Sequence, residues 1–205
     1  MLAACGDSPA LSIARSMKSS IAPSEKSNIT AQQVADIPYA SLLAKIGSGP
    51  LSTLILGKVE GEYLHWFSAD RAVIVTRNGR VIKTAGLPQN LSSSRPLDAD
   101  PLDSLANLSA PAYPHRRQVD ISPGGIYGAI LTLRLVPVGT ETIEILGQSH
   151  NTVVFTEEGE GDGLKWSFRN AYWCDRDTGF IWKSIQNYVP SAPPLEIQVG
   201  KPYLG

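Results

Sequence analysis

Hydrophobic and polar residues alternate over short segments along most of the chain, a pattern typical of β-strands. Three such segments follow one another at 51–59, 62–68 and 71–87, and the last contains Asn78-Gly79 between two β-branched runs. Asn-Gly supplies the positive φ angles of a type I′ turn, so this segment is predicted to be a β-hairpin. Further strands are predicted near 116–122, 126–136, 139–148, 151–158, 164–174, 179–189 and 194–199, with turns at 121–125, 157–163 and 175–179.

Two segments depart from this pattern. Thr30 followed by Gln33 is a capping-box signature, and Pro38 ends the short helix that we expect to begin there. Residues 88–112 are rich in Pro, Ser, Asn and Asp but carry spaced leucines. We interpret them as a surface excursion held to the sheet by its leucines, with a functional loop as the alternative. The predicted fold is mainly β: an antiparallel meander forming a sandwich or barrel-like sheet, with one short N-terminal helix and a long leucine-containing excursion.

The first residues, MLAACGDSP, suggest a processing site. Leu2-Ala3-Ala4-Cys5 resembles a bacterial lipobox, whose cysteine is lipidated and becomes the mature first residue. The basic and apolar regions of a signal peptide are missing before Leu2, so we expect either a shortened form of a precursor or a start assigned too late in the gene. Residues 6–29 are rich in Ser, Ala and Pro without a period, as in a flexible tether. We therefore expect a lipobox remnant and tether over 1–29 and a single β-rich periplasmic domain over 30–205.

Composition narrows the classes of partner. The chain has 205 residues and a formal net charge of −1, with no basic footprint for nucleic acid. No apolar run is long enough for a transmembrane helix, so membrane contact is expected through lipid on Cys5. The chain has two cysteines, Cys5 and Cys174. A disulfide between them is possible by count, but we expect Cys174 to be a buried, unreactive thiol.

The polar residues form few patterns that indicate a metal site or a catalytic site. No two of the histidines have metal-ligand spacing, so we expect structural or solvated roles for His65, His115 and His150, and no metal or cofactor. The run from Glu157 to Asp162 lacks the ligand order of an EF-hand and is predicted to be a solvated acidic hairpin loop. Asp175 and Asp177 are expected to form a turn, with a pair of glycosidase carboxylates as the weaker alternative.

The segment 164–190 is the most specific part of the sequence because it concentrates aromatic residues. Strand periodicity places its even-numbered aromatics and Cys174 on one face, if the intervening turn keeps the parity. That face is interpreted either as core or as a partly exposed platform for sugar rings. On the second interpretation the glycan or partner surface consists of Trp166, Arg169, Asn170, Tyr172, Trp173, Trp182, Lys183 and Gln186.

Within this segment, NAYWCDRDTGFIWKSIQNYVP resembles the C-terminal part of the YjbF/GfcB family, the group 4 capsule polysaccharide lipoproteins. Two further stretches are similar to that family, Ile37-Pro38-Tyr39-Ala40 and Ile55-Leu56-Gly57. The resemblance implies a mainly antiparallel β fold and an outer-membrane lipoprotein that faces the periplasm. It also implies a role with exopolysaccharide or capsule production and export, without catalytic residues to carry over.

Three functions are therefore considered. The first is a non-enzymatic accessory factor for polysaccharide production or export, anchored through Cys5, with glycan or other secretion proteins as partners. The second is a polysaccharide-modifying hydrolase that uses Asp175 and Asp177. The third is a purely structural envelope lipoprotein with a protein interface. The first is the leading hypothesis.

Overall fold

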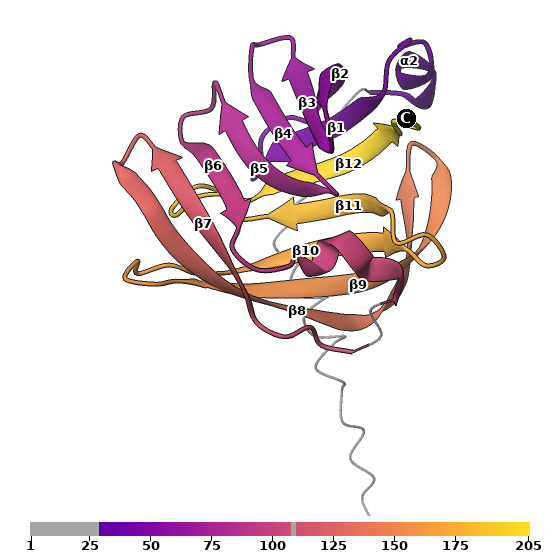
Figure 1. Ribbon diagram of the computed structural model, residues 1–205. Helices are drawn as coiled ribbons and strands as arrows, with labels where there is room; N and C mark the ends of the chain where they lie inside the picture. The colour runs from indigo at the N-terminus through magenta and orange to yellow at the C-terminus, as the bar shows by residue number, and fades with distance from the viewer. Residues whose placement is uncertain (1–28, 108–109) are drawn as a thin grey trace, which may run out of the picture.

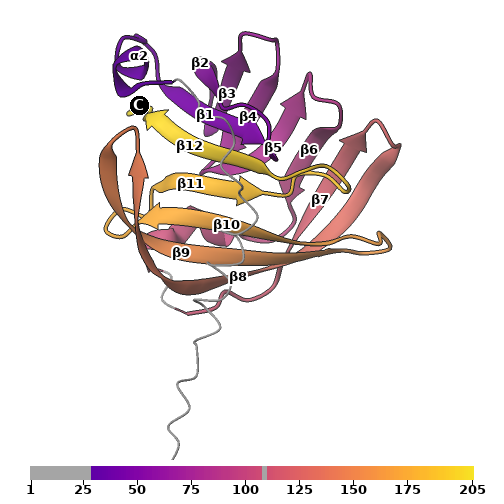
Figure 2. The same ribbon diagram turned by 180° about the vertical axis from the view of Figure 1, so that it is seen from behind.

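In the computed structural model, which describes residues 29–107 and 110–205, antiparallel strands form one strongly curved sheet (Figure 1). The twelve strands follow the order β5-β4-β3-β2-β1-β12-β11-β10-β9-β8-β7-β6, so β5 and β6 lie at the two ends of the order. Because β5 and β6 also lie next to each other, the sheet is nearly closed, as the view from behind shows (Figure 2). The prediction of a mainly β, barrel-like antiparallel meander is confirmed.

The strands are β1 (Ser41–Ile46), β2 (Ser52–Glu60), β3 (Tyr63–Ser68), β4 (Val73–Arg77), β5 (Arg80–Ala85), β6 (Asn90–Pro96), β7 (His115–Ser122), β8 (Ile126–Ile145), β9 (Gln148–Gly161), β10 (Ser167–Asp175), β11 (Ile181–Gln186) and β12 (Leu195–Lys201). The α-helix α2 (Ala31–Ala35) precedes them, and the 3-10 helix η1 (Pro101–Asn107) lies between β6 and β7. Among the described residues, no helix is long and apolar enough to cross a membrane.

Two local predictions are confirmed. Thr30 caps α2 and its side chain accepts a hydrogen bond from the backbone N–H of Gln33, while the Gln33 side chain accepts one from Thr30 N at 2.8 Å. Asn78 and Gly79 have φ angles of 46° and 72° in the turn between β4 and β5. Both angles are positive, as a type I′ hairpin turn requires.

The seam between β5 and β6 is joined by side chains. The Thr84 hydroxyl accepts a hydrogen bond from the backbone N–H of Leu91 at 3.0 Å. The amide group of Gln186, on β11, accepts from Val81 N at 2.9 Å and donates to Gly79 O at 2.8 Å. A side chain that crosses the interior therefore satisfies backbone groups at the edge of β5, where no strand pairs with them.

The interpretation of 88–112 as an excursion is only partly correct. Leu102 and Leu105, in η1, are buried as expected of anchoring leucines. However, Asn90–Pro96 form the strand β6, which pairs with β7 along its length. The serine-rich sequence hides this strand because its small polar side chains give no hydrophobic alternation. Leu108 lies outside the described residues.

The prediction of a solvated acidic loop over 157–163 is wrong. Residues up to Gly161 belong to β9, and the turn begins at Asp162. Glu157 has no exposed surface. Its carboxylate meets an arginine 77 positions earlier in the chain, a partner that local sequence cannot reveal. Likewise, the segments predicted at 126–136 and 139–148 are one strand, β8, whose register shifts between Pro137 and Gly139.

Candidate functional site

A register shift divides the aromatic segment between the two faces of the sheet. Tyr172 lies opposite Ser184 and Trp173 opposite Lys183, but Cys174 then lies opposite Ile181. Trp182 has no partner in this register, so the predicted parity does not hold across the turn. Tyr172 points into the barrel, whereas Trp173 and Trp182 belong to an apolar cluster on the outer side.

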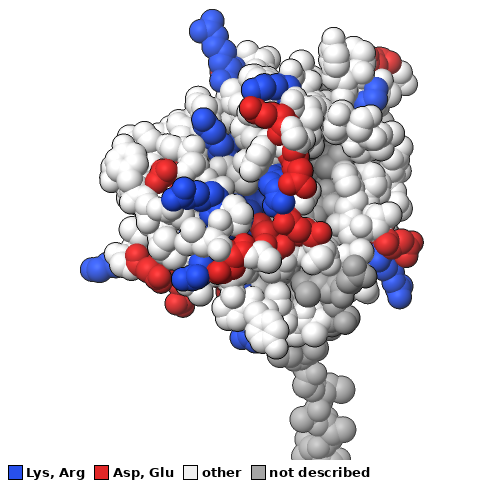
Figure 3. Space-filling view, viewed as in Figure 1, with Lys and Arg blue, Asp and Glu red and all other residues white. Residues whose placement is uncertain are grey.

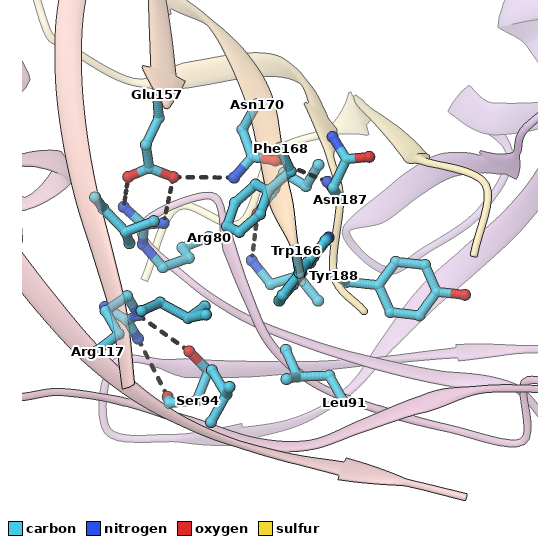
Figure 4. Close-up of a pocket in the computed structure, with 15 residues that line it drawn as sticks. Arg80, Leu91, Ser94, Arg117, Glu157, Trp166, Phe168, Asn170, Asn187 and Tyr188 are labelled. Atoms are coloured by element: carbon cyan, nitrogen blue, oxygen red, sulfur yellow. Dashed lines mark hydrogen bonds and ion pairs between the residues drawn. The ribbon is translucent and has the colours of Figure 1, made fainter. Parts of the chain in front are cut away.

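The interior side holds a buried network of charged groups (Figure 4). Arg80 donates to both oxygens of Asp100, at 2.7 and 3.0 Å, and to both oxygens of Glu157, at 2.8 and 2.6 Å. Arg117 donates to Asp100 at 2.6 Å and to the hydroxyl of Ser94 at 3.0 Å. The four charged side chains are at most 5% exposed. Two positive charges therefore face two negative charges away from water.

Neutral side chains complete the hydrogen bonding of this network. Asn170 and the hydroxyl of Tyr172 both donate to Glu157 Oε2, at 3.0 and 3.2 Å. Burial alone raises the pKa of Glu157, but the attraction of Arg80 outweighs it and holds that pKa well below its usual range. Burial, followed by the positive charge of Arg80, lowers the pKa of Arg117 to about 10.

The space beside this network is small. Its cavity of about 30 Å³ is lined by Arg80, Arg117 and Glu157, with Trp166 and Phe168 towards one side (Figure 4). This volume accommodates one or two water molecules, not a sugar ring. With its charges paired and its carboxylates saturated, the network has the character of a structural core.

A larger groove lies beside the part of the β8–β9 hairpin that extends past the end of β10. Its volume is about 890 Å³, within the range of small-molecule sites. The free end of the β8–β9 hairpin bends towards β10 and β11 (Figures 1 and 2). Its residues Ile143 and Ile145 pack with Trp173 of β10. Three segments line the groove, and their residues are Thr140, Glu141, Thr142, Ser149, His150, Asn151, Thr152, Asp175, Arg176 and Asp177.

Of three rings that pack together, one lines this groove. The imidazole of His150, which lines the groove, lies 3.9 Å from the ring of Trp182 between centroids. Phe180 packs edge-on against Trp182 at 4.8 Å and is 38% exposed. The indole N–H of Trp173 donates to Glu141 Oε2 at 2.9 Å, which fixes that carboxylate at the groove wall. Burial lowers the pKa of His150, so its imidazole is neutral at neutral pH.

Asp175 shapes the third segment as a turn residue, as predicted. Its Oδ1 accepts from the backbone N–H of Thr178 at 2.9 Å, from the Thr178 hydroxyl at 2.8 Å and from Asp177 N at 3.2 Å. Partial burial pushes the pKa of Asp175 up, but these hydrogen bonds prevail and lower it. A glycosidase general acid needs a raised pKa, so the lowered pKa of Asp175 does not suit it to that role.

The residues predicted as a glycan or partner surface fall into three groups. Trp173, Trp182 and Lys183 come together on the outer side, where the Lys183 ammonium lies 5.0 Å above the Trp173 ring. Three others are not on this side but are buried in the interior network: Asn170, Tyr172 and Gln186.

The remaining two predicted residues lie elsewhere. Trp166 stacks on Phe168 at 4.3 Å beside the interior cavity, and Arg169 is exposed and ion-paired with Glu158 at 2.6 Å. Cys5 lies outside the described residues. The groove residues Glu141, His150 and Arg176 were missed as binding residues because they come from β8, from β9 and from the β10–β11 turn, which share no sequence spacing.

Other predicted features can be placed. Cys174 is a free thiol, buried as expected, and burial raises its pKa. No group of three or more His, Cys, Asp or Glu among the described residues is arranged to hold a metal ion. His115 is buried 3.5 Å from Glu157, and neither of its ring nitrogens has a hydrogen-bond partner in the described part of the chain. Acidic and basic side chains intermix across the face shown in Figure 3.

Comparisons with known proteins identify a matching family and two related lipoproteins. The family model described as "Group 4 capsule polysaccharide lipoprotein gfcB, YjbF" matches residues 14–199. The uncharacterized lipoprotein GfcB of Escherichia coli (strain K12) is 27% identical over 191 residues, which cover 93% of this chain and 89% of GfcB. The uncharacterized lipoprotein YjbF of the same strain is 28% identical over 158 residues, covering 77% of this chain and 73% of YjbF.

A solved structure shares the architecture. The crystal structure of the hypothetical lipoprotein YmcC from Escherichia coli (K12) superposes with a TM-score of 0.76, covering 98% of this chain and 99% of that chain. The two chains are 24% identical, so this likeness concerns the fold alone.

Proposed function

Because the chain belongs to the YjbF/GfcB family of group 4 capsule polysaccharide lipoproteins, we propose that it is a lipid-anchored accessory factor in exopolysaccharide or capsule production or export. It would be attached through Cys5 to the periplasmic face of the outer membrane and act by binding glycan, not by cleaving it. The relatives GfcB and YjbF are named as lipoproteins, which supports the anchor. Other exopolysaccharide secretion proteins are proposed as further binding partners.

The observation that carries the glycan-binding role is the groove beside the β8–β9 hairpin and the β10–β11 turn. A sugar ring offers an apolar face of C–H groups and a rim of hydroxyls, so its sites combine aromatic rings with hydrogen-bonding groups. The groove provides both: His150, supported by Trp182, on one side, and carboxylate, hydroxyl and amide groups along its walls. The turn-forming role of Asp175 supports binding over hydrolysis.

The direct test is titration calorimetry of the purified domain with the polysaccharide secreted by its source organism. The Trp182→Ala variant removes the ring that supports His150, and we expect affinity to fall about tenfold, the scale of a lost aromatic contact. Tyr127→Ala is the matched control, since Tyr127 is 74% exposed on β8 and does not line the groove. Equal loss in both variants, or no binding by the wild type, contradicts the proposal.

Trp182 is partly buried, so its truncation also affects packing. The His150→Ala variant serves as the second variant because His150 reaches the groove itself. Thermal unfolding of each variant separates loss of fold from loss of binding. The accessory role is tested in the source organism by deleting the gene: secreted polysaccharide should decrease, and unchanged amount and composition would contradict that role.

A further inference from the structure

The groove has an excess of negative charge. Glu141, Asp175 and Asp177 oppose a single guanidinium, that of Arg176, which gives the lining a formal charge of −2. His150 adds no charge at neutral pH because burial lowers its pKa. Lys183, on the same side of the sheet, is already ion-paired with Glu196 at 3.3 Å. An anionic ligand would therefore meet net repulsion in this groove.

The same groups have unused hydrogen-bonding capacity. Glu141 accepts the Trp173 indole N–H through Oε2, and no described group donates to Oε1. The side chains of Arg176 and Asp177 form no hydrogen bond or ion pair within the described part of the chain. Carboxylates only accept hydrogen bonds, and sugar hydroxyls are donors that match them. Arg176 supplies donors for ring and carbonyl oxygens.

The interior network shows why this imbalance matters. There, each carboxylate faces an arginine at hydrogen-bond distance, as Glu157 faces Arg80. In the groove, the two carboxylates with hydrogen-bonding capacity, Glu141 and Asp177, have no arginine partner among the described residues. Donors for Glu141 Oε1 and for the Asp177 carboxylate must come from water or from a ligand.

On these observations, and resting on the proposed function, we propose that the groove binds uncharged sugars, neutral or N-acylated, and excludes uronate or phosphate-bearing ones. The hydroxyls of such a segment would donate to Glu141 and Asp177, while a ring face lies against His150. An anionic sugar would instead bring a carboxylate or phosphate against the two acidic side chains.

The test uses one polymer in two charge states. The polysaccharide of the source organism is prepared with its carboxyl groups reduced to alcohols, and separately with its primary hydroxyls oxidised to carboxylates. Calorimetry at low salt should show that the reduced form binds at least about tenfold more tightly, as for one like-charge contact in a partly desolvated site. Raising the salt concentration should narrow the difference.

Matched variants assign the effect to the groove. Asp177→Asn should strengthen binding of the oxidised polymer several-fold, because it removes a like charge, and should weaken binding of the reduced polymer, because an amide oxygen is a poorer acceptor than a carboxylate. Asp162→Asn, an exposed acid in the β9–β10 turn outside the groove, should change neither. Equal or tighter binding of the oxidised form overturns this inference while leaving glycan binding intact. Failure of both polymers to bind overturns the proposed function as well.

Discussion

The interior network and the outer groove are built from the same kinds of side chain but differ in how completely these are paired. Inside the barrel, Arg80 directs all of its donors to Asp100, Glu157 and Tyr172. In the groove, Arg176 and Asp177 have no side-chain partner among the described residues. Buried charge is tolerated only when paired, whereas exposed, unpaired charge remains available to a ligand. Pairing therefore separates structural polar residues from candidate binding residues in this protein.

The strongest test of this contrast is removal of Glu157. Glu157→Ala leaves Arg80 buried with only one of its two carboxylates, and losing one partner of a buried ion pair costs about 3–5 kcal/mol. Urea unfolding followed by tryptophan fluorescence measures the change in the free energy of unfolding. The control is Glu158→Ala, at the neighbouring exposed position, which should cost less than about 1 kcal/mol. Similar losses at the two positions would contradict the structural role of the network.

The next effect concerns the seam between β5 and β6. Gln186→Ala removes the bonds to Val81 N and Gly79 O, and leaves buried backbone groups unsatisfied at about 1–3 kcal/mol each. We expect a loss of about 2–4 kcal/mol in the free energy of unfolding. Faster hydrogen exchange of the Val81 amide should accompany it. An unchanged Val81 exchange rate would show that the seam does not depend on this side chain.

The sequence predicted best what depends on neighbouring residues. The Asn78-Gly79 hairpin, the Thr30 capping box and the Asp175 turn each need only contacts within a few positions, and all three are found. The strand-rich pattern was likewise sufficient for the fold class. The aromatic face was not predictable, because one register shift beside Trp173 reverses the parity and no residue type marks it.

The same reasoning explains the partial prediction of the site. Trp182 was identified, but the groove beside it depends on how the β8–β9 hairpin bends after the register shift near Pro137. Glu157 looked like a loop residue because its acidic neighbours are solvated. Its partner Arg80 lies 77 positions earlier in the chain, and only the folded sheet brings the two side chains together.

The pH dependence of stability refines the comparison further. The pKa of Glu157 is lower in the folded protein than in the unfolded chain. Its contribution is therefore fully present above the unfolded pKa of about 4.5, and it is lost as the pH falls below that value towards the folded pKa. The slope from this one group is at most about 1.4 kcal/mol per pH unit. The pKa values place the useful range between about pH 5 and pH 3. In this range the free energy of unfolding of Glu157→Gln should depend less steeply on pH than that of the wild type. An equally steep dependence in the variant would assign the acid sensitivity to other groups.

The smallest expected effect lies within the groove, where two neighbouring aspartates are paired to different degrees. Asp175 holds the turn through Thr178 and Asp177 N, so Asp175→Ala should cost about 1 kcal/mol, as loss of a capping side chain does. Asp177 has an exposed carboxylate without a partner among the described residues, so Asp177→Ala should stay within about 0.5 kcal/mol of the wild type. Parallel urea titrations of the two variants measure this difference. If Asp177→Ala destabilised the protein as much as Asp175→Ala, Asp177 would belong to the turn structure. The groove would then lose a carboxylate that is free to receive a sugar hydroxyl.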